Sequence, residues 1–176
     1  MLRDLTRRHL LGSSLLTASY LVLGTRLTIT PAEAVERDFT PEVLTRPQLK
    51  SIAAVAEHLV PGSIDAGIAA YLDAQLRAGK DSLLIGKYLG VDIPAQVNFY
   101  QTLAGNLQMI LETEQSTAEA INAMWSDNQP TWEGPPASYM LFVLRSDALD
   151  VTYGTQEGFE RLGVPYMAHI MPEKPW

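Results

Sequence analysis

The sequence predicts an all-α fold, a single small helical domain of about five to six helices with an N-terminal signal segment and an irregular, aromatic C-terminal tail. Apolar residues recur at i, i+3 and i+4 spacing in successive segments. Capping residues or a proline precede several of these segments, and no segment alternates with a period of two. The expected division is a signal at 1–34, the helical domain at 35–152 and the tail at 153–176.

The first two helices are expected on either side of Pro61-Gly62, which ends one and separates it from the next. Thr45 is the expected N-cap of the first helix, and Gln48 lies where a capping box requires it. Asp65 is expected to cap the second helix, which ends at Gly79. The apolar stripes are Leu49, Ile52, Val55, Ala56 and Leu59 in the first helix and Ile68, Ala69, Leu72 and Leu76 in the second.

Three longer helices are expected after a short helical piece at Leu83–Leu89. Pro94 opens the longest of them at the first helical position, where its missing N–H costs nothing. Ser116 and the glutamate three residues later predict a second capping box. A turn-rich loop at 128–136 precedes the last helix, which Ser138 is expected to cap. The apolar residues assigned to this helix are Leu141, Val143, Leu144, Ala148, Leu149 and Val151.

The C-terminal tail combines glycines and prolines with aromatic and methionine side chains. This composition is too apolar for a solvated chain end and too rich in helix breakers for a helix. Aromatic anchors dominate protein interfaces, so we expect Tyr153, Phe159, Tyr166 and Trp176 at the contact with a partner protein. The alternative is that the tail closes the core of its own domain.

The N-terminus carries the sequence Thr6-Arg7-Arg8-His9-Leu10-Leu11. The adjacent Arg7 and Arg8, followed by a weakly apolar run to Leu23, are typical of a twin-arginine export signal. Ala32 and Ala34 form a small-x-small cleavage site behind that run. This route carries proteins that are already folded. The sequence therefore predicts a periplasmic protein that binds a cofactor, or accompanies a partner that does. An uncleaved N-terminal anchor is the alternative.

The charge and the cysteine content exclude several classes of function. The net charge of −7 argues against nucleic-acid binding, because phosphates need lysine and arginine partners. The chain has no cysteine. This excludes disulfides, iron–sulfur ligation, thiolate zinc sites, thiol nucleophiles and covalent c-type haem in this chain.

Residues with catalytic or ligating chemistry are sparse. His58 and His169 lack the spacing of metal ligands, so no catalytic, cofactor-binding or metal site is expected in this chain. Asp147 and Asp150 lie three residues apart on the last helix and share a face. They support an alternative, a small hydrolase or isomerase that uses two carboxylates in acid–base catalysis. A solvated or salt-bridged helix face is the commoner role of such a pair.

Three parts of the sequence together resemble one protein family. They are the twin-arginine signal, the block 48–62 with the following 65–73, and the glycine-rich tail with Tyr153-Gly154 and Leu162-Gly163-Val164-Pro165. In this combination the chain resembles the gluconate 2-dehydrogenase subunit 3 family, the small subunit of membrane-associated, FAD-dependent sugar and sugar-acid dehydrogenases. Where that family commonly has Tyr-Gly-Gly-Asn, this chain has Tyr153-Gly154-Thr155-Gln156.

The resemblance implies a subunit without a redox centre of its own. Its implied partners are a large FAD-containing subunit of the glucose-methanol-choline oxidoreductase type, often a membrane-bound multihaem cytochrome c with its haem c, and the twin-arginine translocase. Its implied role is non-catalytic: it escorts the flavoprotein through export and supports maturation with flavin. Beside the enzyme alternative, a free-standing helical binding protein of the cell envelope is also open.

Overall fold

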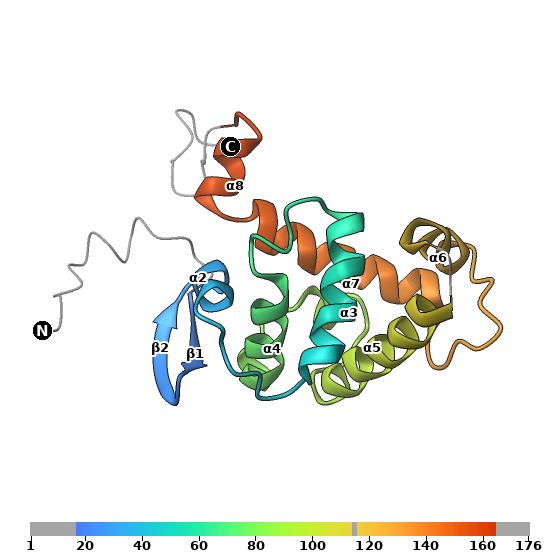
Figure 1. Ribbon diagram of the computed structural model, residues 1–176, viewed down its shortest axis with the longest axis horizontal. Coiled ribbons are helices and arrows are strands. Elements are labelled where there is room, and N and C mark those ends of the chain that lie inside the picture. Colours follow the sequence, from blue (N-terminus) through green and yellow to red (C-terminus); the bar gives the residue numbers. More distant parts are fainter. Residues whose placement is uncertain (1–16, 114–115, 165–176) are drawn as a thin grey trace, which may run out of the picture.

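The computed structural model describes residues 17–113 and 116–164, and confirms a predominantly helical single domain (Figure 1). Seven α-helices lie in this part of the chain: α2 (Pro31–Glu36), α3 (Arg46–Leu59), α4 (Ile68–Ala78), α5 (Gln96–Thr113), α6 (Thr117–Trp125), α7 (Ala137–Tyr153) and α8 (Gln156–Arg161). Two strands, β1 (Ala18–Val22) and β2 (Thr25–Ile29), precede them. Three short 3-10 helices, η1 (Gly79–Asp81), η2 (Ile85–Tyr88) and η3 (Ile93–Ala95), connect α4 to α5.

The core lies where α3 meets α4, α5 and α7 (Figure 1). Each of these helices contributes fully buried aliphatic side chains, among them Ile52, Leu72, Leu103 and Leu144. Burying one such side chain contributes about 1.5–3 kcal/mol to folding. None of the described helices is both long enough and apolar enough to cross a membrane.

Helix α3 forms as the sequence predicts. The Thr45 hydroxyl accepts from the Gln48 backbone N–H at 3.4 Å, and the Gln48 side chain accepts from the Thr45 backbone N–H at 2.8 Å. This reciprocal pair is the expected capping box. The residues of the predicted stripe are buried or half-buried against the core. Local sequence is therefore sufficient to define this helix.

The start of α4 differs from the prediction. Asp65 does not cap the helix, which begins at Ile68 after Gly67 in the left-handed region, with φ 86°. The preceding turn is organised by Glu57 of α3 instead. Its carboxylate accepts from the backbone N–H groups of Gly62 at 2.7 Å and Ile64 at 2.8 Å. These bonds hold the pKa of Glu57 below its ordinary value.

Helices α5 and α6 begin close to the predicted positions. Pro94 lies in η3, one turn before α5, and the Ser116 hydroxyl accepts from the Glu119 N–H at 3.2 Å. Helix α7 begins at Ala137, so Ser138 is already inside it. Its cap is Asp127, whose carboxylate accepts from the Ser138 N–H and hydroxyl, each at 2.8 Å. The pKa of Asp127 is lowered by these bonds.

The hairpin of β1 and β2 was not expected from the sequence. The strands are antiparallel, with Tyr20 opposite Leu27, and are joined by Leu23 and Gly24, which both have positive φ angles. A two-residue turn of this kind matches the twist of a hairpin. The inward side chains Tyr20 and Val22 are buried, but the continuous apolar run around them hides the alternation.

The tail begins with ordered structure. Tyr153 is the last residue of α7, and Thr155 caps the short helix α8 through a hydrogen bond from the Gly158 N–H at 3.0 Å. A helix therefore occupies part of the segment expected to be irregular. Tyr166 and Trp176 lie outside the described residues.

Candidate functional site

The two carboxylates that the sequence singled out have different environments. Asp147 is completely buried in α7, whereas Asp150 is exposed on the same helix. One Asp147 oxygen accepts from the Tyr100 hydroxyl, and the other accepts from the Ile85 N–H at 2.8 Å. Burial raises the pKa of Asp147 to about 7, although both hydrogen bonds favour the charged form.

These contacts give Asp147 a positioning role. It ties η2 to α7, and two further bonds order the same segment: the Tyr139 hydroxyl donates to the Leu89 carbonyl, and the Lys87 ammonium donates to the Ser82 carbonyl at 2.7 Å. Both Asp147 oxygens are occupied by protein donors. A general base needs hydrogen-bond access to its substrate, and in this arrangement both Asp147 oxygens face protein donors instead.

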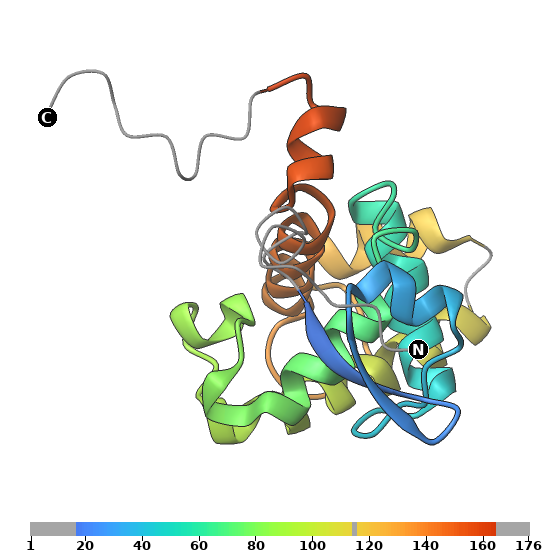
Figure 2. The same ribbon diagram turned by 90° about the vertical axis from the view of Figure 1, so that its left-hand side faces the viewer.

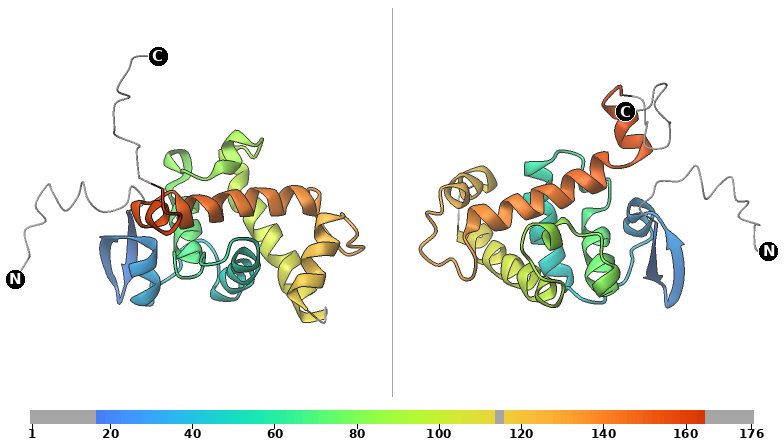
Figure 3. Two further views of the ribbon diagram at one scale, coloured as in Figure 1. Left: turned by 90° about the horizontal axis from the view of Figure 1, so that it is seen from above. Right: turned by 180° about the vertical axis from the view of Figure 1, so that it is seen from behind.

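Exposed apolar side chains lie on α7 and on the segment held by Asp147, and we call this set the α7 surface. It consists of Leu83, Tyr88, Phe142 and Leu149, which are 48%, 74%, 47% and 40% exposed. Phe142 and Leu149 are seven positions apart and so lie on one face of α7. Figure 3 (right) shows α7 crossing the back of the molecule, with η2 in contact along its side. The sequence places Leu149 among the apolar residues of the last helix, and its exposure could not be read from that pattern.

The expected interface residues continue from the end of α7. Tyr153 is half-buried and packs against the core, and Phe159 is half-buried in α8. Leu162 and Val164 follow α8 and are 55% and 48% exposed. In the described part of the tail, apolar side chains are thus distributed between the domain and its surface.

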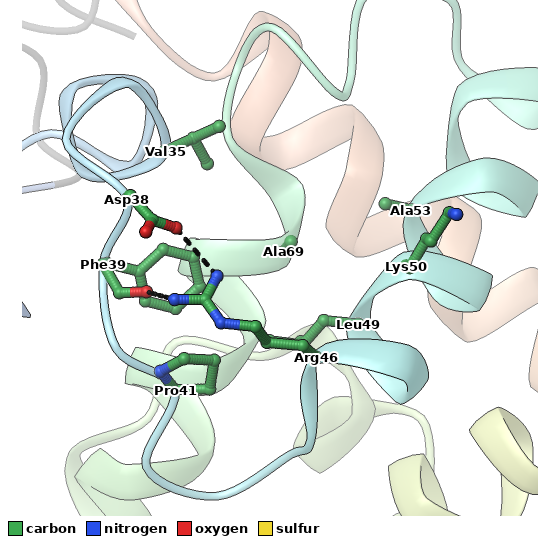
Figure 4. Close-up of a pocket in the computed structure, with 9 residues that line it drawn as sticks. All are labelled: Val35, Asp38, Phe39, Pro41, Arg46, Leu49, Lys50, Ala53 and Ala69. Atoms are coloured by element: carbon green, nitrogen blue, oxygen red, sulfur yellow. Dashed lines mark hydrogen bonds and ion pairs between the residues drawn. The ribbon is translucent and has the colours of Figure 1, made fainter.

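A separate hollow of about 200 Å³ lies between the loop after α2 and the start of α3 (Figure 4). Its apolar wall includes Phe39 and Leu49. The Arg46 guanidinium at its edge donates to Asp38 at 2.8 Å and to the Phe39 carbonyl at 3.1 Å. Small-molecule sites usually measure about 300–1,000 Å³. This hollow is smaller, and the Arg46 guanidinium at its edge is already paired.

The export residues fall in two places. Arg7 and Arg8 lie outside the described residues. Ala32 and Ala34 lie inside α2, where Ala32 is half-buried and Ala34 is completely buried. The predicted cleavage site is therefore part of a packed helix.

No group of three or more potential metal ligands occurs among residues 17–113 and 116–164. His58 is exposed in the last turn of α3. Comparisons of the chain with protein-family models, with curated proteins and with solved structures give no match.

Proposed function

We propose that this protein is the non-catalytic small subunit of a periplasmic, FAD-dependent sugar or sugar-acid dehydrogenase. It escorts the flavoprotein subunit through twin-arginine export and supports its maturation and assembly. The structural observation that carries the proposal is the α7 surface, a set of partly exposed large apolar side chains on α7 and on the segment that contacts it. The export motif and the family resemblance of the sequence add the identity of the partner.

The α7 surface has the properties of a protein-binding site. Phe142 and Leu149 project from a helix anchored on its inner side by Leu141, Leu144 and Ala148, all completely buried. Side chains on such a rigid support lose little freedom on binding. Tyr88 adds an aromatic group, and aromatic residues are frequent hot spots of interfaces. We therefore place the contact with the flavoprotein here, continuing toward Tyr153 and the tail.

The charge of the chain agrees with a role as a binding subunit. With a net charge of −7, the subunit remains soluble before assembly, and no nucleic-acid partner is proposed. The flavin belongs to the large subunit, and haem c belongs to a third, membrane-bound subunit. The small subunit itself supplies the export signal and a docking surface.

Purification of the protein from the cell envelope with a C-terminal tag tests the proposal. We expect a large subunit with flavin absorbance and sugar or sugar-acid dehydrogenase activity to copurify. Isolation of the chain alone, without a flavoprotein, would support a free-standing binding protein. Hydrolase or isomerase activity of the isolated chain, in the absence of any dehydrogenase, would support the enzyme alternative.

Export is tested separately by replacing the arginine pair. Arg7→Lys combined with Arg8→Lys should leave both this chain and the flavoprotein activity in the cytoplasm, because the signal serves both proteins. The measurement is the distribution of the two proteins between periplasmic and cytoplasmic fractions. Normal periplasmic accumulation of the double variant would remove the basis for twin-arginine export.

A further inference from the structure

The outer side of α4 is covered by the chain's own N-terminal unit, defined here as residues 18–44. The hairpin and α2 lie beside α4 at one end of the molecule (Figures 1 and 2), and both β1 and α2 contact α4. Eight of the eleven residues of α4 are buried. A helix at the edge of a domain normally has an exposed polar face. The N-terminal unit is what encloses α4 on this side.

The contact is packed as a core. Tyr20, Val22 and Phe39 are buried, and the rings of Tyr20 and Phe39 meet edge to face with centroids 6.1 Å apart. Ala34 is completely inaccessible. Residues on both sides of the predicted cleavage site thus belong to one continuous apolar cluster with α4.

Polar contacts connect the hairpin to the rest of the chain. Arg77 of α4 donates to the Ser19 carbonyl at 2.5 Å and pairs with Glu42 at 3.2 Å. Arg26 of β2 pairs with the same Glu42 carboxylate. The Thr40 N–H donates to the Leu21 carbonyl at 2.7 Å. These bonds join the hairpin to α4 and to the loop after α2.

The turn before α4 is shaped to receive α2. A Cβ atom at Gly67 would lie 2.3 Å from the Pro31 carbonyl carbon and 2.6 Å from the Ala32 nitrogen. Only glycine allows this approach, and its φ of 86° also favours glycine. The close approach of α2 therefore requires glycine at position 67, which lies in the main body of the domain.

The bond after Ala34 follows a completely buried residue in this arrangement. It lies within α2, whose first turn is closed by a capping box between Thr30 and Glu33. Proteases cleave exposed, flexible segments. If the chain is exported folded, as the proposed function states, the hairpin is already docked when the chain reaches a signal peptidase.

We propose that residues 18–34 remain in the mature protein as a permanent cover of α4, so that any processing of the N-terminus occurs before Ala18. In this arrangement the occupant of the α4 surface is the chain's own hairpin, and no partner binds there. The apolar run of the export signal then ends inside a strand of the folded protein.

The test uses the full chain, produced with its own signal and isolated from the cell envelope. Intact mass and N-terminal sequencing should give a protein that still contains Ala18–Ala34. A mature N-terminus at Val35 would overturn the proposal. As a matched control, Ala32→Glu destroys the small-x-small motif, and an acidic residue is favourable in the first turn of α2. Wild type and variant should begin at the same residue. A longer chain only in the variant would reveal cleavage after Ala34.

Hydrogen exchange of the same full chain provides a second measurement. Amides of β1 and β2 should exchange at least ~100-fold more slowly than in an unfolded chain, as expected for a docked element. Exchange at the unfolded rate would contradict a permanent cover. Neither readout needs the flavoprotein: if no flavoprotein copurifies, the proposed function fails, while the mass and the exchange rates still decide this inference.

Discussion

Helices α4 and α7 pack in the same core, but their outer sides differ in what covers them. The outer side of α4 is enclosed by the N-terminal unit, whereas α7 leaves Phe142 and Leu149 about half exposed. The chain thus uses its own residues to cover one helix and leaves apolar side chains of the other in water. This difference agrees with our proposal that α7, and not α4, contacts another protein.

The two sides also differ in their polar contacts. The buried Asp73 of α4 accepts backbone N–H bonds from Glu42, Val43 and Leu44 at 2.8, 2.9 and 2.8 Å, which fixes the N-terminal unit to the helix. The corresponding buried carboxylate of α7, Asp147, holds η2 at the side of the helix. Asp73 thus fixes the segment that covers α4, and Asp147 fixes the segment beside the exposed side chains of α7.

Removing the Asp73 carboxylate should have the largest effect. Asp73→Ala leaves three backbone N–H groups without their acceptor, and we expect a loss of about 4 kcal/mol in the free energy of unfolding. Denaturant titration followed by circular dichroism measures it. Asp65→Ala is the matched control, because Asp65 is exposed and should have little effect. Equal stability of the two variants would contradict the role of Asp73 in docking the N-terminal unit.

The contribution of Asp147 to the stability of the domain should depend on pH. Burial raises the pKa of Asp147 from its ordinary value of 3.8 to about 7, so between these pH values the folded state holds a proton that the unfolded state has released. Its contribution to stability is complete below about pH 4 and is lost as the pH rises through 7, by about 4 kcal/mol in total.

Asp147→Asn should abolish this decline, because the amide stays neutral and its oxygen can still accept from Ile85. Thermal unfolding of wild type and variant between pH 4 and pH 9 checks the expectation. Asp65→Asn, at an exposed position in the turn before α4, is the control. A decline of the same size in Asp147→Asn would show that another group causes it.

The exposed face is tested by introducing charge. Phe142→Asp combined with Leu149→Asp should lower the free energy of unfolding by about 2 kcal/mol without unfolding the domain, because each side chain is about half exposed and loses only part of its packing. Binding of the flavoprotein should fall by at least ~100-fold, since two apolar anchors are lost. Copurification and a titration of the two subunits measure this. Met109→Asp on α5, 40% exposed, should leave binding intact. Equal loss in both variants would place the interface elsewhere.

The smallest effect is expected at the edge of the α7 surface. Tyr88→Ala removes a side chain that is 74% exposed, so the melting temperature should not change measurably. Affinity for the flavoprotein should decrease by roughly tenfold or less, as for a residue at the rim of an interface. Unchanged affinity would confine the contact to α7 and the tail.

The sequence predicts elements that are defined by neighbouring residues. Thr45 and Gln48 are three positions apart, and the capping box they predict is present. The caps that are predicted wrongly involve residues farther apart in the sequence. Glu57, and not Asp65, orders the turn before α4. Asp127, and not Ser138, supplies the cap of α7. Local pattern cannot identify a cap that is supplied from several residues away.

The site shows the same limit. The sequence places Asp147 and Asp150 on one face of a helix, yet one is buried and the other exposed. The difference depends on Tyr100, 47 positions away, and on η2. The exposure of Phe142 and Leu149 was equally hidden, because α7 is apolar on more than one side and periodicity alone does not reveal which side is packed.

The cap that Asp127 forms on α7 has a practical consequence for the loop between α6 and α7. The carboxylate joins the base of this loop to Ser138, so the two helix ends are connected by a contact that does not involve the loop tip. Pro130 and Thr131 at the tip are exposed. Lengthening a loop costs only about 0.6 kcal/mol per doubling. An affinity tag or fluorescent reporter inserted between them would leave both chain ends free, with the N-terminal arginine pair and the aromatic tail unmodified.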